Sequence, residues 1–196
     1  MDKTQQYNEL LKSIDGCKKC RLCEGRNNIV PGDGSINAQV VFVGEGPGKD
    51  EDLQGKPFVG QAGKFLSELL AGIGMSREDV FITNVVKCRP PNNRDPQEDE
   101  IETCIPYLRE QIKLIKPKVI CTLGKHALKT MISKELNISP SHGKLFKKGS
   151  FHFFAHYHPA AALYNPNLRS VIQHDFVLMK AAVEKILKEE EGTGIE

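Results

Sequence analysis

Residues 39–48 read Gln-Val-Val-Phe-Val-Gly-Glu-Gly-Pro-Gly, an apolar run rich in valine that passes directly into a glycine-rich loop. A short apolar run bounded by glycine is typical of a buried strand. Similar runs predict strands over residues 80–83, 118–123 and 151–157. The segments between them show helical spacing of apolar residues, which predicts helices from Gln61 onward and over residues 101–115, 125–135 and about 168–189.

Strands that alternate with helices pair in parallel and are covered on both faces. We therefore expect an α/β fold, a three-layer α/β/α sandwich with a central four-stranded parallel sheet. The chain of 196 residues shows no linker and no internal repeat, which predicts one domain over 1–196 with a frayed acidic end at about 189–196. Ligands of such folds bind at the carboxyl ends of the strands, where Glu45, Asn84 and His158 would meet.

The composition is that of an ordinary globular protein, with 39% hydrophobic residues and a formal net charge of +2. This charge neither demands nor excludes a nucleic-acid partner, because phosphate binding depends on where the charges lie. No apolar run approaches the roughly 18 residues that cross a membrane, and the first residues are polar. These features predict a cytoplasmic protein without a membrane segment.

The cysteines suggest a metal site. Cys17 and Cys20 form a Cys-x2-Cys pair, and Cys88 and Cys104 flank a loop rich in proline and asparagine. In a reducing compartment, clustered cysteines bind metal or do chemistry more often than they form disulfides. Four thiolates can hold a zinc ion or a [4Fe–4S] cluster, and the spacing leaves this choice open. Cys23 is a rival ligand at the same interval.

The loops at the strand ends hold the candidate catalytic residues. The segment Gly44–Gly48 lacks the Lys-Ser/Thr of a P-loop and the third glycine of a dinucleotide motif, which argues against nucleoside triphosphates and NAD. A carboxylate at this position is a candidate for acid–base chemistry. Phe58 lies in a glycine-flanked loop, either as a core residue or as a stacking platform for a base. His158 is either a site residue or a structural histidine.

Four motifs in register resemble family 4 uracil-DNA glycosylases, the iron–sulfur branch of that superfamily. They are Gly44-Glu45-Gly46-Pro47-Gly48, Gly55-Lys56-Pro57-Phe58-Val59-Gly60-Gln61-Ala62-Gly63, Thr83-Asn84-Val85-Val86-Lys87-Cys88-Arg89-Pro90-Pro91 and His158-Pro159-Ala160. The resemblance implies hydrolysis of the N-glycosidic bond of deoxyuridine in DNA, which releases uracil and leaves an abasic site for base excision repair. It also implies a [4Fe–4S] cluster held by Cys17, Cys20, Cys88 and Cys104.

The resemblance further implies a role for individual residues. His158 would donate a hydrogen bond to uracil O2, Asn84 would read O4 and N3–H, and Phe58 would stack on the flipped base. The backbone amide of Gly46 would help to bind O2. The catalytic carboxylates would be Glu45, which orients water or stabilises the cationic sugar, and Glu51, which lies near uracil C5.

The expected partner is uracil-containing DNA, single- or double-stranded, and we expect the protein to act as a monomer. Lys87, Arg89 and Arg94 are candidates for phosphate contacts, although each could equally be a solvated surface charge. Leu163 is the candidate for the wedge that fills the gap left by the flipped base. One alternative is a relative that traps its substrate by means of a histidine-bearing loop, but residues 89–94 contain no histidine. The other alternative is a glycosylase for several deaminated bases, and Glu45 favours the uracil-specific branch.

Overall fold

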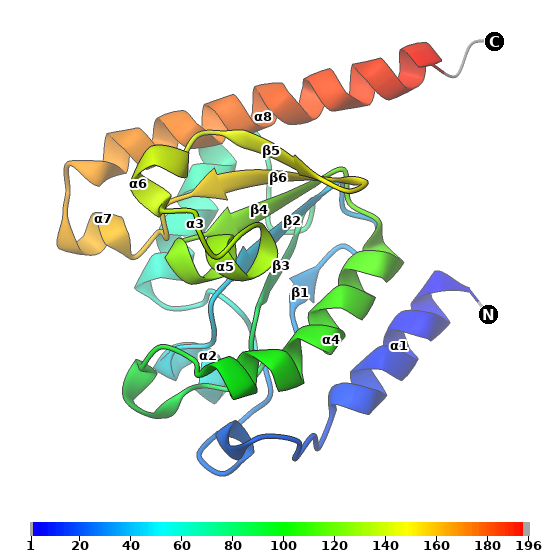
Figure 1. Ribbon diagram of the computed structural model, residues 1–196, viewed down its shortest axis with the longest axis vertical. Coiled ribbons are helices and arrows are strands. Elements are labelled where there is room, and N and C mark those ends of the chain that lie inside the picture. Colours follow the sequence, from blue (N-terminus) through cyan, green and yellow to red (C-terminus); the bar gives the residue numbers. More distant parts are fainter. Residues whose placement is uncertain (1, 194–196) are drawn as a thin grey trace.

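A parallel sheet forms the centre of the protein (Figure 1). The computed structural model describes residues 2–193, with side chains as far as Glu190. The four central strands follow the predicted apolar runs to within one or two residues. They are β2 (Val40–Gly44), β3 (Phe81–Asn84), β4 (Val119–Leu123) and β6 (Phe151–His156), all mutually parallel.

Two short edge strands correct the expectation of a purely parallel, four-stranded sheet. Strand β1 (Asp33–Gly34) pairs antiparallel with β3, and β5 (Leu145–Lys148) pairs antiparallel with β6. The result is a mixed six-stranded sheet in the order β1-β3-β2-β4-β6-β5. Strand β1 has only two residues and β5 is largely exposed, so neither carries the buried apolar run that identifies the central strands.

Helices cover both faces of the sheet and complete the predicted three-layer sandwich. Helices α1 (Lys3–Ile14), α4 (Glu98–Ile115) and α5 (Lys125–Met131) pack on one face. Helices α3 (Gln61–Gly72) and α8 (Leu168–Thr193) pack on the other. The alternation of side chains along β2 supplies both cores, because Val41 and Val43 face the first helical layer while Val40 and Phe42 face the second.

Helix α1 adds to the elements expected from the sequence. Its N-terminus is fixed by a capping box between Asp2 and Gln5, which satisfies backbone N–H groups at that end. The helix lies beside α4 (Figure 1), and the hydroxyl of Tyr107 donates to the carbonyl of Ser13 at 3.3 Å. Helix α4 runs through Pro106 without interruption.

Shorter elements connect these layers. They are α2 (Lys49–Gln54), α6 (Ile138–Ser141), α7 (Ala161–Tyr164) and the 3-10 turns η1 (Arg21–Cys23) and η2 (Pro91–Asn93). Helix α8 extends to Thr193, and the remainder of the segment expected to fray lies outside the described residues. Within residues 2–193, no helix is long and apolar enough to cross a membrane.

The topology brings polar residues together at one end of the sheet. Strand β2 lies between β3 and β4, so the chain runs from β2 to β3 on one side and then returns from β3 to β4 on the other side of β2. Such a switch point is where open α/β folds bind ligands. Each central strand supplies one polar residue there: Asn84 at the end of β3, and Glu45, His126 and His158 shortly after β2, β4 and β6.

Candidate functional site

A cavity of about 380 Å³ lies at the carboxyl ends of the central strands. This volume is within the range of small-molecule sites, about 300–1,000 Å³. The cavity brings together six of the residues that the sequence predicted for base recognition and catalysis. These lining residues are Glu45, Gly46, Glu51, Phe58, Asn84 and His158.

Asn84 presents an unpaired polar atom to this cavity. Its side chain is 1% exposed, and its Oδ1 has no hydrogen-bond partner among the described residues. A buried carbonyl oxygen without a partner is unfavourable by about 1–3 kcal/mol, so such groups usually serve a ligand or a water. Gly44 makes room for this amide, because a Cβ at that position would collide with Asn84 Oδ1 and lie 2.7 Å from the Phe58 ring.

Phe58 and His158 form an aromatic wall of the cavity. Their ring centroids lie 5.5 Å apart with an interplanar angle of 29°. Phe58 has a left-handed backbone with φ of 52°, which is uncommon for a bulky residue and indicates an imposed conformation. Arg77 holds this backbone by donating to the carbonyls of Pro57 at 2.7 Å and Phe58 at 3.0 Å. A Cβ at Gly63 would overlap the Phe58 carbonyl, so the glycine permits the close approach.

Burial sets the charge state of His158. It lowers the pKa of the imidazole to about 4, with a smaller opposing effect from the nearby carboxylate of Glu51. His158 is therefore neutral at physiological pH. A neutral imidazole can donate one hydrogen bond without bringing a positive charge into the cavity.

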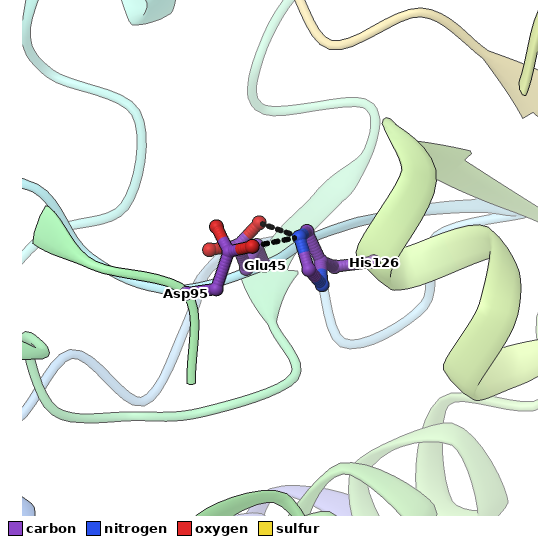
Figure 2. Close-up of side chains that lie close together, drawn as sticks. All are labelled: Glu45, Asp95 and His126. Carbon is purple, nitrogen blue, oxygen red and sulfur yellow. Dashed lines mark ion pairs between the residues drawn. The ribbon is translucent and has the colours of Figure 1, made fainter. Parts of the chain in front are cut away.

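Glu45 lies at the rim of the cavity in a cluster of ionisable side chains (Figure 2). His126 Nε2 lies 3.5 Å from Glu45 Oε2 and 2.9 Å from Asp95 Oδ2. Lys125 Nζ lies 3.5 Å from the same Asp95 oxygen. Burial, helped by the charge on Asp95 and opposed by Lys125, raises the pKa of Glu45 to about 7. A carboxyl group with a pKa near neutrality is well suited to proton transfer at physiological pH.

The carboxylate of Glu51 accepts hydrogen bonds from the backbone of the neighbouring loops. One carboxylate oxygen accepts from the amides of Val59 and Gly60, each at 2.9 Å, and the other accepts from the amide of Gly48 at 3.1 Å. These contacts hold the Phe58 loop against the start of α2. The structure thus shows Glu51 positioning these loops, and its expected catalytic role beside Glu45 stays a prediction.

Four cysteines converge from three segments of the chain. Cys17, Cys20, Cys88 and Cys104 line one small cavity, which Cys23 also borders. Three of the sulfurs have nearby donors: Arg26 Nη1 lies 3.3 Å from Cys88 Sγ, the Lys87 amide 3.3 Å from Cys104 Sγ, and the Tyr107 hydroxyl 3.4 Å from Cys17 Sγ. Donors of this kind stabilise thiolates that ligate a metal. Cys121 lies fully buried in β4, apart from this group.

Lys87 is not available to DNA, which corrects its expected phosphate contact. The side chain is 1% exposed, and its Nζ donates to Thr83 Oγ1 at 2.6 Å, the Asn84 carbonyl at 2.9 Å and Gln111 Oε1 at 2.7 Å. It ties the end of β3 to helix α4 beneath the site. Arg89 is half-buried and donates to Asn93 Oδ1 at 2.7 Å.

The remaining candidates lie outside the cavity or at its edge. Arg94 borders the cavity but pairs with the buried carboxylate of Glu100 at 2.6 Å. Leu163, the expected wedge, is 48% exposed on α7 directly after the His158 loop. Its neighbour Tyr164 is 89% exposed, and no motif in the sequence indicates it as a wedge.

Comparison with known proteins identifies the family. The profile described as the Uracil DNA glycosylase superfamily matches residues 31–186. The chain is 50% identical to a type-4 uracil-DNA glycosylase of Sulfurisphaera tokodaii, over 90% of this chain and 83% of the relative. It is 52% identical to the type-4 enzyme of Saccharolobus solfataricus, over 85% and 82% of the two chains. For the type-4 enzyme of Archaeoglobus fulgidus, the identity is 47%, over 88% and 90%.

The chain belongs to the type-4 branch of the uracil-DNA glycosylase superfamily. The sequence motifs had indicated this branch from its loops alone. The motifs did not include Asp95 and His126, which the fold brings to Glu45 from two other segments. No motif indicates Asp95 or His126. In this type-4 chain His126 is 81 positions beyond Glu45, and the parallel pairing of β2 with β4 makes Glu45 and His126 neighbours.

Proposed function

We propose that this protein hydrolyses the N-glycosidic bond between uracil and deoxyribose in DNA, releasing uracil and leaving an abasic site for base excision repair. The observation that carries the proposal is the buried, unpaired Asn84 amide oxygen, which faces a cavity beside the Phe58–His158 wall. The membership of the type-4 branch supports it.

Asn84 supplies the base specificity in this proposal. Its Oδ1 accepts the N3–H of uracil and its amide N–H donates to O4, while the backbone N–H of Gly46 helps to hold O2. Cytosine presents an acceptor at N3 and a donor at N4, which would leave buried polar groups unpaired on both molecules. Mismatches of this kind can discriminate by about 10⁴.

His158 stabilises the leaving group, and Phe58 holds the base by stacking. When the C1′–N1 bond breaks, both electrons leave with uracil and negative charge accumulates on O2. A neutral imidazole N–H directed at O2 strengthens its hydrogen bond as that charge develops, which lowers the barrier. The neutral state that burial imposes on His158 suits this role.

Glu45 acts on the sugar side of the broken bond. The sugar becomes cationic, and an ionised carboxylate at the rim of the cavity can stabilise it electrostatically. The same carboxylate can accept a proton from the water that attacks C1′. Glu51 serves as a positioning residue that fixes the Phe58 loop.

DNA binding completes the proposal. The target nucleotide must leave the base stack to reach the cavity, at a cost of a few kcal/mol. The exposed end of α7, with Leu163, lies next to the His158 loop and can fill the vacated space. Arg89 is the remaining basic candidate for a phosphate contact. We further propose that the protein works as a monomer in the cytoplasm.

The cysteine quartet fits a [4Fe–4S] cluster better than a zinc ion. Among the described residues, the only group of three or more His, Cys, Asp or Glu ligand atoms within 4.8 Å of one another is Glu45, Asp95 and His126. Sulfurs around a single zinc ion lie about 3.8 Å apart, given Zn–S bonds of about 2.3 Å. In the described part of the chain, no three of the sulfurs of Cys17, Cys20, Cys88 and Cys104 lie within 4.8 Å of one another, which favours a cluster, and a cluster here would cross-link the loop 89–97 to the N-terminal segment.

An alkaline-cleavage assay tests the proposed function. A labelled oligonucleotide with one uracil is incubated with the protein and then treated with alkali, which cuts the strand at an abasic site. We expect cleavage at uracil in single- and double-stranded DNA, many product molecules per protein molecule, and no cleavage when thymine or cytosine replaces uracil. A single turnover followed by a trapped protein–DNA adduct would contradict the proposal and favour the substrate-trapping alternative.

A further inference from the structure

The Nε2 atom of His126 lies close to the carboxylates of Glu45 and Asp95 (Figure 2). His126 is the second residue of α5, which begins just beyond β4, and its side chain is 23% exposed. Its Nε2 lies 2.9 Å from Asp95 Oδ2 and 3.5 Å from Glu45 Oε2. A proton on this nitrogen is therefore attracted by two carboxylates, whereas a proton on Glu45 only removes the repulsion between Glu45 and Asp95.

Other charged groups surround this pair on α5 and across the cavity. Lys125 contacts Asp95 at 3.5 Å and opposes the rise in the pKa of Glu45, and Lys129 acts on His126 from the next turn of the helix. Across the cavity lie Glu51, which is held by backbone amides, and His158, which is neutral. Arg94 is paired with Glu100.

Burial acts on the titration of both side chains. It raises the pKa of Glu45 and lowers the pKa of His126, while Asp95 raises the pKa of both groups. Burial alone therefore favours a proton on Glu45 over a proton on His126, and the two carboxylates close to His126 Nε2 oppose this preference by attracting the proton to the imidazole. Groups that interact this closely titrate as a unit rather than separately.

We propose that His126 is a positioning residue for Glu45: it takes the proton that burial would otherwise place on the Glu45 carboxyl, and it thereby keeps Glu45 ionised in the site. The inference deepens the proposed function, on which it rests, because Glu45 must carry a negative charge opposite the cationic sugar. One proton leaves Glu45 Oε2 and binds His126 Nε2, and no other bond changes. Asp95 steadies the resulting imidazolium.

DNA binding makes this arrangement more important. A bound strand covers the cavity and removes water from Glu45, which pushes the pKa of a carboxyl group further upward. An imidazolium 3.5 Å away acts in the opposite direction, since an opposite charge within about 4–6 Å lowers the pKa of a carboxyl group by about 1–3 units. His126 can therefore preserve the charge of Glu45 under the conditions in which the reaction takes place.

The experiment removes the positive charge of His126 and keeps a side chain of similar size. His126→Gln leaves a neutral N–H donor near the position of Nε2 but cannot be protonated. Single-turnover rates of uracil release are measured from pH 5 to 9 with DNA in excess of its dissociation constant. We expect the acidic limb of the variant profile to move upward by about one pH unit or more, a loss of about tenfold at pH 6, with little change at pH 9.

A second readout does not require activity. With ¹³C-labelled glutamate, the Glu45 carboxyl signal is assigned by its absence in Glu45→Gln, and it is titrated in the wild type and in His126→Gln. We expect the midpoint of Glu45 to rise in the variant. If the wild type releases no uracil, the proposed function fails while this titration still decides the role of His126.

Controls separate charge from structure. His174→Gln changes an exposed histidine on α8 and should leave both profiles unchanged. His126→Asn repeats the test with a shorter neutral amide in case His126→Gln folds poorly, as judged by its thermal unfolding midpoint. A rate that falls by the same factor at every pH, or an unchanged Glu45 midpoint, would overturn the proposal and leave His126 with a packing role only.

Discussion

The backbone N–H of Ala160 donates a hydrogen bond to His158 Nδ1 at 3.1 Å. A neutral imidazole with an acceptor at Nδ1 must carry its proton on Nε2. The backbone N–H of Ala160, two residues after the histidine, therefore selects the tautomer of His158. Burial keeps the ring neutral, with a pKa of about 4, so the Nε2–H donor persists across the neutral range.

The first prediction follows from this tautomer. His158→Ala should lower the single-turnover rate of uracil release by about 10²–10³, the usual loss for one donor to a developing anion. DNA affinity should stay nearly level, because the hydrogen bond strengthens only as the glycosidic bond breaks. Rates and affinities are measured by rapid quench and by fluorescence anisotropy. A tenfold loss of affinity with an unchanged bound-state rate would make His158 a binding residue instead.

The pH dependence has a definite sign. Since the pKa of His158 is lowered to about 4, the imidazole gains a proton only below that pH, so it should contribute no limb to the rate profile between pH 5 and 9. Any limb in that range then belongs to Glu45 and its partners, whose ionised form is lost as the pH falls. The limb should disappear in Glu45→Gln, at a much lower overall rate.

Asn84 gives the second prediction. Asn84→Asp should slow uracil release, because a carboxylate cannot donate to O4. A protonated carboxyl can donate and accept in the reversed order, so the variant should gain weak activity on cytosine at acidic pH. The measurement is alkaline cleavage of matched uracil and cytosine oligonucleotides. Unchanged uracil kinetics in Asn84→Asp would remove this residue from base recognition.

The cysteines give the third prediction. Protein purified without oxygen should be brown, with a broad absorbance near ~400 nm that is typical of thiolate-bound iron–sulfur clusters. Cys88→Ser should lose this colour, and Cys23→Ser, its matched control, should keep it. Iron and sulfide analysis gives the stoichiometry. A colourless protein with one equivalent of zinc would retain the four ligands but exclude the cluster.

The apolar runs predicted the central sheet well, because a strand that is buried on both faces must be apolar along its whole length. Val40–Gly44 and Val119–Leu123 are buried at every position, so their local composition alone identifies them. Strand β5 has no such signal, because only one of its four residues is even partly buried. Strand β5 forms by pairing with β6, a tertiary contact that the local composition of β5 does not predict.

The site was predictable where a motif lies on one loop and unpredictable where the fold joins distant segments. Lys87 illustrates the limit: it sits in a basic-looking segment beside Cys88, yet Gln111, on the neighbouring helix α4, captures its ammonium in the interior. His126 illustrates the opposite error, since it gave no signal in the sequence and yet reaches Glu45. Neither outcome follows from spacing along the chain.

The last prediction concerns the wedge on α7. Leu163 and Tyr164 are 48% and 89% exposed beside the His158 loop. In duplex DNA a flipped uracil leaves a gap, and an apolar side chain that fills it offsets an unstacking cost of a few kcal/mol. In single-stranded DNA there is no paired stack to restore. Leu163→Ala should therefore slow uracil release from duplex by about tenfold or more and leave the single-strand rate nearly unchanged, with Tyr164→Ala acting in the same direction.

Leu178→Ala is the matched control, because Leu178 is 40% exposed on α8 and should affect neither substrate. A U·G mispair should be less sensitive than a U·A pair, since less pairing energy must be overcome before the base leaves the stack. Equal losses on single-stranded and duplex DNA would place Leu163 in general DNA contact rather than in the stack. If neither α7 variant changes the duplex rate, the wedge must come from another loop at this end of the sheet.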